Sequence, residues 1–295
     1  MPANTKATYS VYSKQYLEYT ARKGLRPQSQ VSLCAFMKDA LETRKLVRGT
    51  LIGVIPAAVE SIFRFEAESP ARDPNGTALL KQTKRTISML TEKSKPKLPM
   101  LRKHLLAMTA LCQDEPQEVR DMFMLLLMFV GFLRESEAVS LRHADVWIET
   151  VPETGQEALY VVVRKSKTDQ FSENATIVLG ACPGHHLCPV MWYRLHVNKR
   201  LDSLFLFHKL TRVAGEKLAD RTPRHTVKRW LEKIGVCPIG YGSHSLRRGG
   251  ATAAARAKVQ MHVIKRHGRW ASDAVYLYIV DGIEEQLGVS AAVLG

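Results

Sequence analysis

The first ninety residues place apolar side chains at three- and four-residue steps, which is the spacing of one helix face. The pattern predicts four helices, over residues 8–24, 29–44, about 47–68, and a fourth that ends near residue 90. Ser29 is a suitable N-cap for the second helix, because its hydroxyl can accept a bond from a free backbone N–H. Pro56 predicts a kink or break in the third, because proline has no N–H to donate.

After residue 100 the pattern becomes mixed. Apolar periodicity predicts helices near 100–112 and 117–131, whereas 157–164 and 174–179 are rich in β-forming residues. The polar run between these two β-rich segments predicts a hairpin. Most of the remainder again has a helical pattern. The expected fold class is mainly α with a small β-hairpin or sheet, an α+β architecture.

A polar, lysine-rich stretch with two prolines separates the two patterns and is the expected linker. It covers residues 93–99, which leaves a helical domain over 1–92 and a second domain over 100–295. The second domain ends in a tail, residues 279–295, which carries a short apolar stripe.

The charge balance narrows the class of partner. The chain of 295 residues has 43 Lys and Arg against 28 Asp and Glu, a formal net charge of +15. Such an excess is typical of proteins that displace counterions from nucleic acid or from anionic lipid. The longest apolar run, Met122 to Leu133, is well short of the roughly 20 residues that span a bilayer. Five scattered cysteines and a polar N-terminus predict an intracellular protein without a membrane segment.

One loop contains residue types that bind zinc, namely Cys182, His185, His186 and Cys188. The spacing is cramped for a tetrahedral site, and the flanking prolines predict an ordinary loop. We therefore expect no metal there.

The segment that begins at Ser243 carries the most informative chemistry. His244 and Arg247 are three residues apart at the start of an alanine-rich helix, for which Ser243 is a suitable N-cap. The free N–H groups at such a helix end favour an anion, so a phosphate would fit. A His-x-x-Arg pair alone is a weak motif, which incidental charge at a helix start explains more often.

The pair belongs to a larger constellation. Its members are Arg134, Glu137, Leu141, Asp145, Ser166-Lys167-Thr168, His244-x-x-Arg247, Gly268-x-Trp270 and Tyr278-Ile279. In order and spacing, residues 97–295 resemble the catalytic domain of the tyrosine recombinases, also called the phage-integrase family. The segment from Gly268 to Ala274 is most similar to recombinases of eukaryotic mobile elements of the DIRS and Crypton kinds. The resemblance implies a core-binding (DNA-clamp) domain in residues 1–92.

The implied reaction is the cleavage and rejoining of DNA through a 3′-phosphotyrosine, independent of metal, ATP or another cofactor. Tyr278 is the implied nucleophile, with Tyr276 as the competitor that a helix would turn to another side. Arg134 and Arg247 are implied to hold the scissile phosphate through paired hydrogen bonds and to stabilise the transition state. His244 would help remove the phenol proton, because a free phenol with a pKa of about 10 stays protonated at neutral pH.

Two further residues would support these groups. Trp270 takes the place where many relatives have a second histidine, and its indole N–H could donate to a phosphate oxygen, with packing alone as the alternative. Glu137 would orient Arg134 or His244 rather than touch DNA.

The remaining expectations concern lysines and DNA contacts. Lys167 matches the general acid that protonates the leaving 5′-oxygen, with Lys165 as the alternative, because a hairpin register cannot be read to one residue. The residues expected to contact DNA are Lys93, Lys95, Lys97, Arg248 and His267, the last either facing DNA or capping a helix.

The resemblance also implies double-stranded DNA as partner and self-assembly into a tetramer on two duplexes, a dimer at each site, with no small-molecule substrate. The tail would dock on a neighbouring subunit or on its own domain. The expected role is integration or excision of a mobile element, in the nucleus for a eukaryotic element and otherwise in the cytoplasm or nucleoid. A DNA-relaxing enzyme like the type IB topoisomerases and a catalytically inactive DNA-binding protein are the alternatives.

Overall fold

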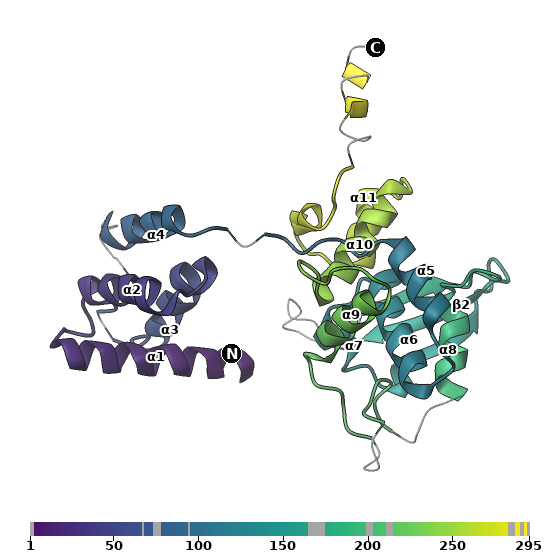
Figure 1. The fold of residues 1–295 in the computed structure, drawn as a ribbon, viewed down its shortest axis with the longest axis horizontal. Helices are drawn as coiled ribbons and strands as arrows, with labels where there is room; N and C mark the ends of the chain where they lie inside the picture. The colour runs from purple at the N-terminus through teal and green to yellow at the C-terminus, as the bar shows by residue number, and fades with distance from the viewer. Residues whose placement is uncertain are drawn as a thin grey trace. The chain divides into compact units, whose positions relative to one another are not determined.

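The computed structural model describes residues 3–66, 68–72, 78–93, 95–164, 175–198, 203–210, 215–282, 287–289 and 292–293. The chain divides into two compact units, Met1–Lys95 and Pro96–Gly295 (Figure 1). The fold is mainly helical with one small antiparallel sheet, which confirms the expected fold class.

The first unit contains α1 (Ala3–Lys23), α2 (Gln30–Arg44), α3 (Ile55–Ile62) and α4 (Ala78–Leu90). In it α1 packs on α3, and α2 packs on α4. Tyr16 and Phe36 are buried in its core with their ring centroids 5.5 Å apart, and the Tyr16 hydroxyl donates to the Pro27 carbonyl at 2.6 Å. Ser29 accepts a hydrogen bond from the Val31 N–H and caps α2, as its position predicts.

The third helix is shorter than predicted, and the regular α-helical pattern is interrupted just before Pro56, where a kink or break was predicted. A π-helical segment, η1 (Thr50–Val54), precedes α3, which ends at Ile62. The N–H of Ile55 donates to the carbonyl of Thr50, five residues back, just before Pro56. Proline has no N–H, so the i→i−4 hydrogen bonds of the α-helix are interrupted at Pro56 in any case. The wider π-helical turn lies just before this interruption.

The expected linker is only partly a connector. The backbone N–H of Leu98 donates to Gly240 at 3.0 Å, and that of Met100 donates to Ser245 at 2.8 Å. The last residues of the predicted 93–99 linker are thus fixed to the second unit.

The second unit is built around α6 (Pro116–Val130). The other helices of this unit are α5 (Arg102–Leu111), α7 (Glu135–Ala138), η2 (His143–Asp145), α8 (Pro189–Asn198), α9 (Thr222–Lys233), α10 (Ser243–Arg256), α11 (Met261–His267) and η3 (Asp273–Leu277). Every residue of α6 from Val119 to Phe129 is buried, and α5, α7, α8, α9 and α10 all contact this helix (Figure 1). From Met122 to Phe129 this helix is apolar on all sides and must be enclosed, so α6 is the scaffold of the unit. None of the described helices is long and apolar enough to cross a membrane.

The sheet has three strands in the order β1 (Val146–Thr150), β2 (Glu157–Val163) and β3 (Ala175–Gly180), all antiparallel. The pairing of β2 with β3 follows the two β-rich segments of the sequence, and the turn predicted between them lies outside the described residues. β1 was not expected. Its outer residue Trp147 pairs with Tyr160 and stacks on it with the ring centroids 5.5 Å apart.

Two glycines let α10 approach its neighbours closely. A Cβ atom at Gly249 would lie 1.9 Å from the Met100 carbonyl oxygen, and one at Gly250 would lie 2.0 Å from that of Phe129. Both obstacles are backbone atoms, which cannot move aside as a flexible side chain does. The helix that carries His244 and Arg247 therefore depends on glycine for its position.

Gly249→Ala should lower the free energy of unfolding by about 3 kcal/mol, although alanine normally stabilises a helix relative to glycine by about 1 kcal/mol. All four tryptophans lie in the second unit, so tryptophan fluorescence during denaturant unfolding reports this unit alone. Gly288→Ala, at a position with open space around it, is the matched control and should change nothing. An equally stable Gly249→Ala protein would contradict the close packing.

The buried His196 predicts a pH dependence of stability. Its Nε2–H donates to the Leu206 carbonyl at 2.8 Å, and burial lowers its pKa from 6.5 to about 4. Because the unfolded chain takes up the proton at a higher pH, stability is lost as the pH falls from 6.5 towards 4, by up to about 3 kcal/mol. The same fluorescence titration of His196→Gln, which keeps a donor for Leu206, should show a flatter dependence. Parallel curves for the two proteins would refute this.

Candidate active site

Tyr278 is directed onto a cluster of cationic and aromatic side chains. It follows η3 directly, and its ring centroid lies 5.2 Å from that of Trp270 and 6.5 Å from that of His244. The guanidinium carbon of Arg247 lies 5.5 Å from the centroid of the phenol ring. Tyr276, by contrast, is 59% exposed. The structure therefore brings Tyr278 together with His244, Arg247 and Trp270.

The segment that bears Tyr278 is tied to α10 by backbone contacts. Arg248 Nη1 donates to the Leu277 carbonyl at 2.9 Å. The Thr252 hydroxyl donates to the backbone carbonyl of Tyr278 at 3.2 Å. The same hydroxyl oxygen accepts from the Val280 N–H. Arg248 thus holds the tyrosine segment, a contact that the expectation of a DNA-binding role did not include. Thr252 was missed, because a threonine inside an alanine-rich helix gives no signal in the sequence.

Arg247 is fully buried and is held by carbonyl oxygens. Its Nη2 donates to Gly268 at 2.6 Å, and its Nη1 donates to Phe132. The Trp270 ring covers the guanidinium, with 4.0 Å between the guanidinium carbon and the ring centroid. These contacts join the end of α6, α10 and the turn after α11 at one point.

A second cationic group assembles at the start of α7. Arg134 precedes this helix, and its Nη1 donates to Glu137 Oε1 at 2.6 Å, while its backbone N–H donates to Oε2 at 2.8 Å. Arg269 Nη2 donates to the same Oε2 at 2.7 Å. Glu137 is buried and orients Arg134, the first of the two alternatives for this carboxylate. Arg269 was missed, because it stands at the unspecified position of the Gly-x-Trp motif.

The charges of this group shift one another's pKa values. Burial by itself would raise the pKa of Glu137, but the charge of Arg269, followed by the backbone N–H and the charge of Arg134, lowers the pKa below its ordinary value. Burial, and then the charges of Arg134 and Arg269, lowers the pKa of Arg247 to about 10. The carboxylate is therefore ionised and the guanidinium protonated at neutral pH.

Several buried donors of the site have no acceptor among the described residues. They are Nε of Arg247, Arg248 and Arg269 and Nε1 of Trp270. Buried N–H groups are rarely left unpaired in proteins, and oxygens of an anion would satisfy them. His244, the second residue of α10, is exposed beside them. The site combines donors for an anion with a phenol that faces them.

Lys167 and its alternative Lys165 lie outside the described residues. Ser243 was expected to cap α10, but the helix begins at Ser243 itself, with Gly242 as N-cap and the Ser245 hydroxyl accepting from the Gly242 N–H.

His267 is turned inward. Its Nε2–H donates to the Val130 carbonyl at 2.7 Å, and its ring packs edge-on against Phe132 with the centroids 4.7 Å apart. Burial lowers its pKa, so the ring stays neutral at neutral pH. The bond to Val130, the last residue of α6, fits the capping alternative for His267.

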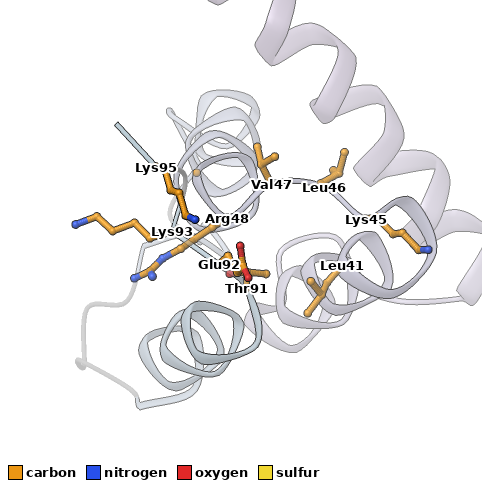
Figure 2. Close-up of a pocket in the computed structure, with 10 residues that line it drawn as sticks. Leu41, Lys45, Leu46, Val47, Arg48, Thr91, Glu92, Lys93 and Lys95 are labelled. Atoms are coloured by element: carbon orange, nitrogen blue, oxygen red, sulfur yellow. The ribbon is translucent and has the colours of Figure 1, made fainter. Parts of the chain in front are cut away.

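The three lysines of the predicted linker fall into two places. Lys97 belongs to the second unit, where its aliphatic stem lies beside Gly242 at the start of α10. Lys93 and Lys95 belong to the first unit and line a pocket of about 710 Å³. Lys45 and Arg48 also line this pocket, and Figure 2 shows Arg48 and Lys93 reaching towards the same side of it. These two basic residues were not predicted.

The loop that carries Cys182, His185, His186 and Cys188 lies within the described residues. Among the described residues, no group of three or more His, Cys, Asp or Glu side chains is arranged to hold a metal ion. The Sγ of Cys188 instead accepts from the Cys182 N–H at 3.2 Å, and His185 Nδ1 accepts from the Leu187 N–H. Local turn contacts thus occupy the side chains of Cys188 and His185.

The sequence matches the model of the phage integrase family over residues 100–278, and this chain belongs to that family. A curated relative, the integrase/recombinase xerD homolog of Selenomonas ruminantium, is 28% identical over 196 residues, which are 63% of this chain and 54% of that protein. The chain therefore spans about half the length of this relative.

Solved structures share the fold at low sequence identity. The XerH site-specific recombinase bound to palindromic difH substrate, a post-cleavage complex, has a TM-score of 0.66 and 17% identity, covering 97% of this chain and 78% of its own. A lambda integrase(75-356) dimer bound to a COC′ core site has a TM-score of 0.63 and 14% identity, covering 92% and 90%. The Tn1549 transposon integrase in complex with circular intermediate DNA has a TM-score of 0.59 and 13% identity, covering 96% and 98%.

Proposed function

We propose that this protein is a site-specific DNA recombinase that cleaves and rejoins DNA through Tyr278. The observation that carries the proposal is the placement of the Tyr278 phenol against Arg247, Trp270 and His244. A phenol in contact with a buried guanidinium is suited to attack a phosphodiester, because the added negative charge of the transition state meets fixed positive charge.

The proposed step conserves the energy of the broken bond. The Tyr278 oxygen attacks phosphorus, a 3′-phosphotyrosyl bond forms, and the 5′-oxygen of the next nucleotide leaves with a proton. Attack by a 5′-hydroxyl reverses these events and releases the tyrosine. No ATP is consumed, because one phosphodiester replaces another.

Each remaining group takes one part of this step. Arg134 and Arg247 hold the phosphate oxygens, His244 helps to remove the phenol proton, and the Trp270 indole N–H donates to a phosphate oxygen. Lys167, or Lys165 in its place, protonates the leaving oxygen. Glu137 keeps Arg134 in position through the 2.6 Å contact.

Double-stranded DNA is the proposed substrate, and a tetramer on two duplexes the proposed assembly. DNA-bound recombinases and integrases with this fold, including a transposon integrase, support DNA as the substrate. The tetramer is what the resemblance to the family implies. The first unit would clamp DNA, with Lys93 and Lys95 next to phosphates. We assign the protein to a mobile element, and the Gly268-Arg269-Trp270 segment favours the DIRS or Crypton kind.

Tyr278→Phe should abolish covalent capture of DNA, because phenylalanine has no oxygen to attack phosphorus. The probe is a pool of duplexes with a random central segment, each carrying a nick that lets the short fragment with the freed 5′-hydroxyl diffuse away after cleavage. Adducts that survive SDS are counted and sequenced, which also yields the site. Tyr276→Phe is the matched control and should retain capture, since Tyr276 is exposed to solvent.

Equal capture by Tyr278→Phe and the wild type would refute the nucleophile. A wild-type protein that traps no duplex of the pool, yet relaxes supercoiled plasmid of unrelated sequence, would favour the topoisomerase-like alternative. A wild-type protein that neither traps a duplex nor relaxes plasmid would favour the alternative of a DNA-binding protein without catalysis.

The double variant Lys93→Gln, Lys95→Gln should bind DNA more weakly without changing cleavage of bound DNA. If each lysine neutralises one phosphate, the slope of log K against log salt should become shallower by about 2. Fluorescence anisotropy with a labelled duplex from the pool measures both. Lys14→Gln, on an exposed face of α1, is the control. An equal loss with Lys14→Gln would show that overall charge, and not the pocket, decides affinity.

A further inference from the structure

Arg269 has a backbone conformation that arginine rarely adopts. Its φ is +58°, in the left-handed region, and it follows Gly268 at the end of α11. A Cβ at Gly268 would lie 1.7 Å from the Trp270 ring, so this glycine is needed for the ring to fold back. Unfavourable backbone conformations of this kind persist where the surroundings enforce them.

The conformation directs the Arg269 side chain inward, where it is 10% exposed. Its Nη1 donates to the His267 carbonyl at 3.2 Å and lies 3.4 Å from that of Gly131, and its Nη2 donates to Glu137 Oε2 at 2.7 Å. The guanidinium is therefore held from two directions against a carboxylate 132 residues away in the sequence.

Glu137 is shared between two arginines with different surroundings. Arg134 contacts one carboxylate oxygen through its guanidinium and the other through its backbone N–H, and Arg269 contacts the second oxygen as well. The charge of Arg269 lowers the pKa of the Glu137 carboxylate more than the charge of Arg134 does. Without Arg269, the full negative charge of Glu137 would fall on Arg134, the residue that is to hold the phosphate.

We propose that Arg269 is a positioning residue for strand cleavage: it balances part of the charge of Glu137, so that Glu137 orients Arg134 without cancelling its charge. This role rests on the proposed function, because it presumes a phosphate at Arg134. A purely structural role, in which Arg269 only joins the turn after α11 to α7, is the competing explanation that an experiment must separate.

A charge-compensation series separates the two roles. The variants are Arg269→Gln, Arg269→Lys, Glu137→Gln and the double variant Arg269→Gln, Glu137→Gln. The rate of adduct formation is measured at saturating protein on a duplex recovered by covalent capture, with DNA affinity and thermal midpoint recorded for each. Arg194→Gln removes an exposed Arg–Glu contact of 2.6 Å and is the matched control for the loss of an ion pair.

Arg269→Gln should slow adduct formation at least about tenfold while DNA affinity stays within about twofold, since the lost charge acts on the transition state. Removing the carboxylate as well takes away the charge that Arg269 balanced, so the double variant should react faster than Arg269→Gln. Arg269→Lys should keep most of the rate, and Arg194→Gln should keep all of it.

The proposal is overturned if Arg269→Gln reacts as fast as the wild type, or if the double variant is as slow as Arg269→Gln or slower. The second result would mean that the two side chains serve folding alone. A wild-type protein that forms no adduct would instead refute the proposed function, and the two failures are therefore distinct.

Discussion

The second unit depends on the hydrogen bonds that the buried guanidinium of Arg247 donates to two backbone carbonyls. Taking an arginine out of water is costly unless its N–H groups find acceptors, and here the carbonyls of Phe132 and Gly268 supply two of them. Those carbonyls belong to the end of the α6 segment and to the turn after α11. The same side chain that would meet a phosphate thus also fixes the relative positions of three parts of the site. A substitution of Arg247 would therefore affect the packing of the second unit as well as the proposed contact with a phosphate.

The strongest patterns in the sequence predicted the helices well, and two details show why the remainder was not predictable. β1 offers only Val146, Trp147 and Ile148 before it turns polar, too short a run to distinguish from a loop. The third helix has apolar periodicity throughout and Pro56 predicts an interruption, but neither signal predicts that the residues before Pro56 form a π-helical segment. The spacing of apolar residues predicts which face of a helix is buried, whereas the ends of a helix depend on which backbone N–H and C=O groups find hydrogen-bond partners.

The candidate site shows the same division. Tyr278 and Arg247 lie together as the spacing of the motif indicated, while Arg248 and His267, read as DNA contacts, donate to carbonyls of their own unit. A basic residue looks the same in a sequence whether it faces solvent or a carbonyl. Arg269 was overlooked because its partner Glu137 is distant in the sequence, and only the folded structure brings the two side chains together.

The backbone bonds of Leu98 and Met100 to the start of α10 have a practical consequence for dissecting the protein. A fragment intended to represent the second unit alone has to begin before Leu98, although a boundary at residue 100 looks natural from the prolines. Cutting after these residues would remove the N–H groups that satisfy the carbonyls of Gly240 and Ser245, next to His244. Such a fragment could lose its activity through a frayed helix start rather than through the missing first unit.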